Sequence, residues 1–129
     1  MGVDERRITI VESPFTTPTA DRLSCVRYAL WACFDCICAG EAPFASHLLY
    51  TQMLPETSGS RSMGLQMRDR MATATGGLIA HYIDLGVTPG MLRDVDCTAV
   101  VEKRTLKGLV LAAWKRGEWP NASVRLAVL

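Results

Sequence analysis

The chain has 129 residues, of which 49% are hydrophobic, and its 14 basic and 13 acidic residues leave a formal net charge of +1. This length suits a single domain spanning 1–129 with a buried core, and the balanced charge, with no basic stripe, argues against nucleic-acid binding. No apolar run approaches the roughly 20 residues of a membrane span and the first ten residues lack the layout of a signal peptide, so we expect a cytoplasmic protein that binds no membrane.

The first part of the chain predicts a strand, a helix and a long loop. β-Branched residues over 8–11 indicate a short buried strand. Apolar residues then recur every three or four positions, which is typical of one helix face. We expect this helix to begin at Thr17 and Pro18 and to end at Gly40. A short extended stretch near 43–45 precedes a long turn-rich segment, and a loop of that length is more often functional than idle.

The second part alternates helices and strands. Met63, Met67 and Met71 repeat every four residues over 61–71, which predicts a helix with a core-facing methionine stripe. The later elements expected are a strand ending at Asp84, a helix beginning near Thr88, a strand over 99–103, a helix over 106–117, and a tail, 121–129, that is either a last strand or a segment docked on a neighbour. This alternation predicts an α/β fold, a single three-layer domain with a mainly parallel sheet.

Four of the five cysteines crowd into one apolar segment, and Cys33 and Cys36 form a C-x-x-C pair. Such a pair suits redox chemistry at a helix N-terminus, or half of a zinc site. Here it falls in the middle of the predicted helix, and no second pair completes a tetrahedral site. We therefore expect reduced cysteines that pack as small apolar residues, with no bound metal. The glycine motifs of phosphate loops and dinucleotide-binding folds are also absent, so no cofactor is expected.

Ligands of open parallel sheets bind beyond the carboxyl ends of the strands. Two strand-to-helix turns, at 12–19 and 84–91, carry hydroxylated residues and new helix starts, whose N–H groups favour anions. Asp84 ends a strand and Asp94 lies in the first two turns of the next helix, so both can border one pocket. Paired carboxylates suit chemistry at a sugar anomeric carbon. The alternative is that Asp84 caps the turn and Asp94 is a solvated helix residue.

Three stretches, "GEAPFASHLLYTQML", "RSMGLQM" and "YIDLGVTPGM", resemble a group of small bacterial and phage domains related to the nucleoside 2-deoxyribosyltransferases. The turn "ESPF" is similar to the small-Pro-aromatic turn that follows the first strand in that superfamily. The resemblance spans roughly residues 8–104 and implies a flavodoxin-like or Rossmann-like sheet that binds a nucleoside or nucleotide. It also implies a homo-oligomer, because transferases of this superfamily share sites between subunits.

The resemblance assigns roles to individual residues. In the transferases a nucleophilic glutamate follows the pattern S/T-x-G-x-x-x-E, and aligning Thr88 and Gly90 with this pattern puts Asp94 at the glutamate position. The replacement shortens the side chain by one methylene. Asp84 takes the place of an acid that contacts the sugar or base. The residues implied to bind the ligand are Ser13, Pro14, Phe15, His47, Tyr50, Gly86, Thr88, Gly90 and Met91.

Two functions follow from this assignment. The first is an enzyme that cleaves or transfers an N-glycosidic bond, with Asp94 as nucleophile or cation stabiliser and Asp84 positioning the sugar. The second is a non-catalytic module that captures a nucleotide for sensing or sequestration, as in a phage setting. A third, structural role would place Trp114 and Trp119 at a subunit interface, unless they fold back on the sheet. His47, read without the resemblance, is equally well a loop residue bonded to the backbone.

Overall fold

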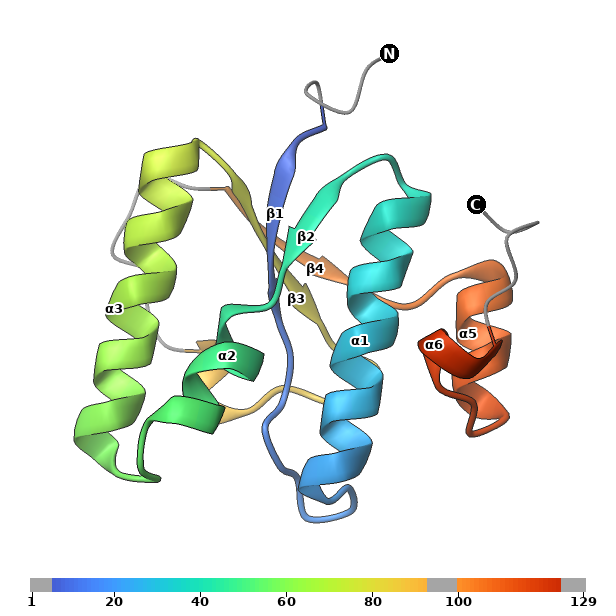
Figure 1. Ribbon diagram of the computed structural model, residues 1–129, viewed down its shortest axis with the longest axis horizontal. Helices are drawn as coiled ribbons and strands as arrows, with labels where there is room; N and C mark the ends of the chain where they lie inside the picture. Colours follow the sequence, from blue (N-terminus) through green and yellow to red (C-terminus); the bar gives the residue numbers. More distant parts are fainter. Residues whose placement is uncertain (1–5, 93–99, 124–129) are drawn as a thin grey trace.

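The computed structural model describes residues 6–92 and 100–123, which form an α/β fold around a four-stranded sheet (Figure 1). All three strand pairings are parallel and the strand order is β2-β1-β3-β4. The strands are β1 (Ile8–Glu12), β2 (Ala42–Phe44), β3 (Leu78–Tyr82) and β4 (Val100–Arg104). This order matches the first four strands of the flavodoxin-like arrangement 2-1-3-4-5. The predicted α/β fold with a parallel sheet is therefore confirmed.

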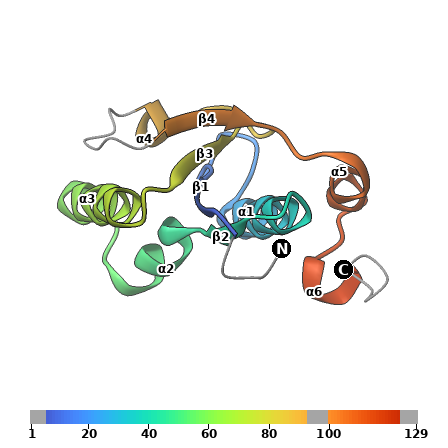
Figure 2. The ribbon, with the colours of Figure 1, turned by 90° about the horizontal axis from the view of Figure 1, so that it is seen from above.

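Helices cover both faces of the sheet, which gives three layers (Figure 2). The helices are α1 (Arg22–Cys38), α2 (Ser46–Met53), α3 (Ser58–Thr75), α4 (Pro89–Leu92), α5 (Gly108–Lys115) and α6 (Pro120–Ser123). Helices α1 and α5 pack together on one face, and α2 and α3 lie on the other. The chain leaves β1 toward β2 on one side and returns to β3 on the other, so the direction of winding reverses between β1 and β3.

The two central strands are buried because helices cover both of their faces. All five residues of β3 and the last four of β1 are buried, so their apolar runs are nearly continuous rather than alternating. On the α1 face the core includes Val11, Tyr28, Trp31, Ala80 and Tyr82. The Trp114 ring of α5 packs on that of Tyr28 at a centroid distance of 5.3 Å, so this tryptophan folds back on the domain.

Two predicted helix features are wrong in detail. Helix α1 begins at Arg22, not at Pro18, because the Asp21 carboxylate accepts the Ser24 backbone N–H at 2.8 Å and caps it. Thr17 instead stabilises the preceding turn, where its hydroxyl oxygen accepts the Ala20 N–H at 2.9 Å. The segment after β2, which was expected to be a loop, contains the helix α2. No side-chain hydrogen bond caps the start of this helix, so the sequence gives no signal for it.

The methionine stripe of α3 faces the core only in part. Met71 packs against the core cluster of Ile10, Ala72 and Ile79, whereas Met63 is 50% exposed. The buried residues of this helix are Arg68, Asp69 and Ala72. Helix α3 is also longer than the predicted 61–71. The side of α3 that meets the sheet therefore carries a buried arginine, which is unusual unless that arginine has partners.

The C-x-x-C pair lies within α1, as predicted, but in its last two turns rather than in its middle, and its thiols are free. Burial raises the pKa of Cys36 to about 11 and that of Cys33 to about 12, so neither thiol is activated. Cys97 lies outside the described residues. Residues 121–123 of the tail are helical rather than extended, and 124–129 also lie outside. Among the described residues, no helix combines the length and apolarity that a membrane crossing requires.

Candidate functional site

A cavity of about 820 Å³ lies at the carboxyl ends of the central strands, next to the point where the winding reverses. It is bounded by the end of β1, by α2, by the N-terminal half of α3 and by the start of α4, all near the lower end of the sheet in Figure 1. The residues that line it are Glu12, Ser13, Phe15, Thr16, Arg22, Ser46, His47, Tyr50, Thr51, Leu54, Pro55, Glu56, Ser58, Ser60, Arg61, Gly64, Leu65, Thr88, Pro89 and Met91. A volume of this size is in the range of small-molecule sites.

The structure brings most of the predicted ligand-binding residues to this cavity. The predicted residues that line it are Ser13, Phe15, His47, Tyr50, Thr88 and Met91. Pro14 is fully buried within the first turn and does not line the cavity, and Gly86 adopts a left-handed conformation (φ +93°) in the turn that leads to α4. Gly90 lies within α4. The two strand-to-helix turns that the sequence singles out therefore meet at one site.

Asp84 lies elsewhere, in a structural hydrogen-bond network. Its Oδ2 accepts the Tyr28 hydroxyl and the Leu106 backbone N–H, the latter at 3.0 Å. Its own backbone N–H donates to the Tyr28 oxygen at 2.9 Å. These bonds tie the end of β3 to α1 and to the segment before α5, and Asp84 is not among the residues that line the cavity. Asp94, its predicted partner, lies outside the described residues.

Ser13 and His47 form a hydrogen-bonded pair in the cavity, with 3.0 Å between the Ser13 Oγ and the His47 Nε2. Burial lowers the pKa of His47 to about 4, and the Val11 carbonyl opposes that shift. The imidazole is therefore neutral at physiological pH. His47 thus contributes a neutral hydrogen-bonding group that joins the start of α2 to the turn after β1.

A buried ionic cluster of Glu12, Arg68, Asp69 and His81 lies behind the cavity, and Glu12 is the member that lines its floor. Their exposed fractions are 6%, 1%, 8% and 8%, in that order. The Arg68 Nη1 donates to the Glu12 Oε1 at 3.2 Å, and the Arg68 Nε donates to the Asp69 Oδ1 at 2.8 Å. His81 pairs with Glu12 in the register of β1 and β3. One guanidinium therefore serves two carboxylates.

Within this cluster, the pKa of Glu12 is raised and that of His81 is lowered. Burial raises the pKa of Glu12, and the charge and hydrogen bond of Arg68 only partly oppose this. Burial lowers the pKa of His81, which the neighbouring Glu12 opposes. Glu12 and Arg68 were not among the predicted site residues. Glu12 could have been predicted by the criterion used for Asp84, since both are acids at the end of an apolar strand. No local sequence pattern distinguishes Arg68 as a buried residue.

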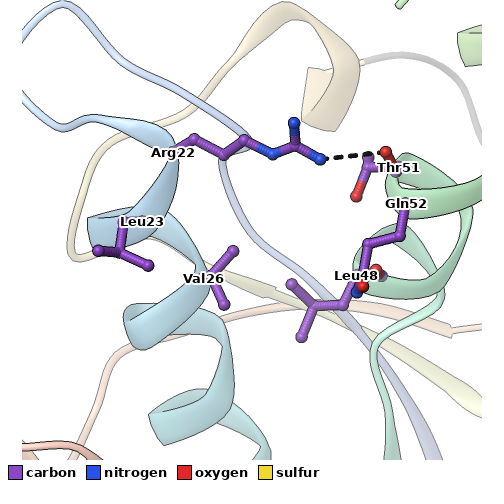
Figure 3. Close-up of a pocket in the computed structure, with 6 residues that line it drawn as sticks. All are labelled: Arg22, Leu23, Val26, Leu48, Thr51 and Gln52. Carbon is purple, nitrogen blue, oxygen red and sulfur yellow. Dashed lines mark hydrogen bonds between the residues drawn. The ribbon is translucent and has the colours of Figure 1, made fainter. Parts of the chain in front are cut away.

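The mouth of the cavity carries a second set of charges. The Arg22 guanidinium lies over the Phe15 ring, 4.7 Å from its centroid, and also pairs with Glu56 at 3.4 Å. Figure 3 shows the same arginine reaching from α1 to the Thr51 carbonyl oxygen of α2, which it contacts at 3.1 Å. It thereby separates the main cavity from a shallow groove of about 390 Å³ lined by Leu23, Val26, Leu48 and Gln52.

Arginine, hydroxyl and aromatic groups dominate this site, and they suit an organic ligand with polar and anionic parts. Within residues 6–92 and 100–123, no group of three or more His, Cys, Asp or Glu side chains is arranged to hold a metal ion. The side chains that line the cavity offer a ligand hydrogen bonds, ring stacking and charge.

Fold and site together define a flavodoxin-like α/β domain with a ligand-sized cavity at the carboxyl edge of its sheet. The chain belongs to a family described as a domain of unknown function (DUF7768), whose model matches residues 7–107. No curated protein and no solved structure matches the chain. The matched range includes all four strands and every residue that lines the cavity.

Proposed function

We propose that this domain binds a nucleoside or nucleotide in the cavity at the end of β1. The observation that carries the proposal is the location of the cavity, at the carboxyl ends of β1 and β3 where the winding of the sheet reverses. Open α/β sheets bind their ligands at this point. The resemblance of "HLLY" and "DLGVTPGM" to the nucleoside 2-deoxyribosyltransferase group also supports a nucleoside ligand.

The lining of the cavity supports the same class of ligand. Phe15 and Tyr50 offer aromatic surfaces against which a base can stack. Ser13, Ser46 and Thr88 offer hydroxyl groups that can bond to a sugar. A nucleoside combines a flat ring system with a hydroxylated sugar, so it uses both kinds of group.

The test is calorimetric titration of the full chain with the common ribonucleosides, deoxyribonucleosides and their 5′-monophosphates, using Gly64→Leu as the blocking variant. A Cβ added at Gly64 meets only the Tyr50 Cβ, at 3.9 Å, so the helix accepts a side chain there. Leucine then occupies cavity volume, and we expect affinity to fall at least about tenfold, or 1.4 kcal/mol.

Gly64→Ala is the matched control for this experiment. It adds one methyl group in ordinary contact with Tyr50 and should keep the affinity. It should also raise the free energy of unfolding by about 0.5–1 kcal/mol, because glycine is unfavourable inside a helix. If no member of the panel binds, or if Gly64→Leu binds like the wild type, the proposal is wrong.

Catalysis at the N-glycosidic bond is a second candidate function, and Glu12 favours it. Glycoside chemistry commonly uses two carboxyl groups, one of them with a raised pKa that lets it act as an acid. Glu12 is a buried carboxyl group of this kind at the cavity floor. We propose Glu12, in place of Asp84, as the partner of Asp94, which the resemblance puts at the nucleophile position.

Chromatography of the reaction mixture distinguishes catalysis from capture. An enzyme releases or exchanges free base, and Asp94→Asn abolishes that activity by removing the carboxylate. A binding module returns its ligand unchanged after the protein is denatured, which would assign sensing or sequestration instead. The expected homo-oligomer is a separate proposal, which sedimentation equilibrium tests.

A further inference from the structure

One face of α3 runs from the mouth of the cavity to its floor. Arg61, Gly64 and Leu65 line the cavity, and Arg68 follows on the same face because these positions are spaced by three and four residues. Arg68 contacts Glu12 at the floor. Arg61 therefore lies about 10 Å from Arg68 along the helix axis, at 1.5 Å per residue.

The charges of the cavity differ in whether they are already paired. Arg22 and Glu56 pair with each other at the mouth, and Arg68 is held between Glu12 and Asp69. The Arg61 side chain is exposed and forms no ion pair or hydrogen bond with any residue that the structure describes, whereas its backbone N–H donates to the Thr57 carbonyl. Arg61 is thus the cation of the described cavity lining that is available to a ligand anion.

At the floor of the cavity, the Glu12 carboxyl group is buried and acidic, whereas Arg61 at the mouth is exposed and basic. It is 6% exposed, lies at the cavity floor, and takes one hydrogen bond from Arg68 through Oε1. The oxygens of this carboxyl group accept hydrogen bonds from hydroxyl and amino groups. The floor therefore favours the part of a ligand that donates hydrogen bonds.

We infer that the ligand of this cavity is a nucleotide rather than a nucleoside, with its phosphate group bound by Arg61 and its sugar or base donating hydrogen bonds to Glu12. The inference rests on the proposed function and names the ligand class within it. A phosphorylated nucleoside has an anion at one end and donor groups at the other, which matches the order of charges along α3.

The experiment compares each nucleoside with its own 5′-monophosphate by calorimetry, in the wild type and in Arg61→Gln. We expect each monophosphate that binds to do so at least about tenfold more tightly than its nucleoside, as a charge-assisted hydrogen bond allows. Arg61→Gln should remove this difference, because it removes the cation that binds the phosphate. Arg70→Gln is the matched control, because it removes the same charge from an exposed position of α3 that does not line the cavity.

Glu12→Gln tests the floor. Its amide oxygen can still accept from Arg68, so the fold is kept, as a melting curve can verify. The new amide group donates where the carboxylate accepts. We expect nucleosides and monophosphates to lose affinity by the same factor, at least about tenfold.

The outcomes separate this inference from the proposed function. If nucleosides and monophosphates bind equally well, or if Arg61→Gln keeps the preference for monophosphates, the inference is overturned and nucleoside binding stands. Unchanged affinities in Glu12→Gln overturn the assignment of the floor. If nothing in the panel binds, both proposals fail.

Discussion

Arg68 both stabilises the domain and positions a residue that lines the cavity. Its guanidinium is 1% exposed and bonds to both Glu12 and Asp69, so it neutralises charge that would otherwise be buried alone. A buried ion pair contributes little compared with apolar packing, but removal of one partner is costly. The same contact fixes the Glu12 carboxyl group at the cavity floor.

Arg68→Met should therefore destabilise the domain severely. The change leaves two buried carboxylates without their cation, and we expect the free energy of unfolding to fall by about 3–5 kcal/mol. Urea denaturation measures this difference. The control, Arg70→Met, removes an exposed arginine of the same helix and should change the value by less than about 0.5 kcal/mol. Equal effects of the two variants would show that Arg68 does not stabilise the buried acids.

His47 should make stability depend on pH. Its pKa falls from 6.5 in the unfolded chain to about 4 in the fold, so the unfolded state binds more protons between these values. The free energy of unfolding is therefore unaffected by this titration above pH 6.5 and decreases as the pH falls toward 4. His47→Gln lacks this titration, so the wild type should lose about 1–2 kcal/mol more than the variant between pH 7 and pH 5 in urea denaturation. Parallel losses would contradict the lowered pKa of His47.

At the level of elements, the sequence predicts best what local physics decides. Strands β1 and β3 can be recognised from the sequence as β-branched or apolar runs, because both strands are buried on both faces. Helix α2 was missed because its N-cap residue, Ala45, offers no side-chain hydrogen bond and so gives no start signal. Thr17 gave a false signal because a hydroxyl group can cap a turn as well as a helix.

The junction of α3 and β3 depends on a close backbone approach at Gly77. A Cβ at this position would lie 2.8 Å from the Ile8 carbonyl oxygen, which is fixed in β1. Gly77→Ala should therefore lower the free energy of unfolding by about 1–3 kcal/mol, as overpacking does. Gly59→Ala is the control, because its Cβ meets nothing nearer than 3.9 Å. Thermal melting compares the two, and a Gly77→Ala variant as stable as Gly59→Ala would rule out the clash.

Across the whole molecule, the sequence predicted the location of the cavity better than the arrangement of the charges around it. The two turns that it singled out do meet, because the carboxyl ends of parallel strands share one edge. The partners of the key charges are distant in sequence: 56 positions separate Arg68 from Glu12 and also Tyr28 from Asp84. No local sequence pattern encodes such pairs. The buried position of Glu12 and the structural role of Asp84 could therefore be recognised only in the three-dimensional structure.

The most direct test of the account is a titration of the ¹⁵N-labelled chain with nucleoside 5′-monophosphates, followed by backbone amide NMR. Binding in the cavity predicts saturable shifts at Ser13, His47 and Arg61, which line it, with little change at Cys33 and Lys115 on the opposite face of the sheet. Shifts confined to the α1 and α5 face, or none with any nucleotide, would contradict it.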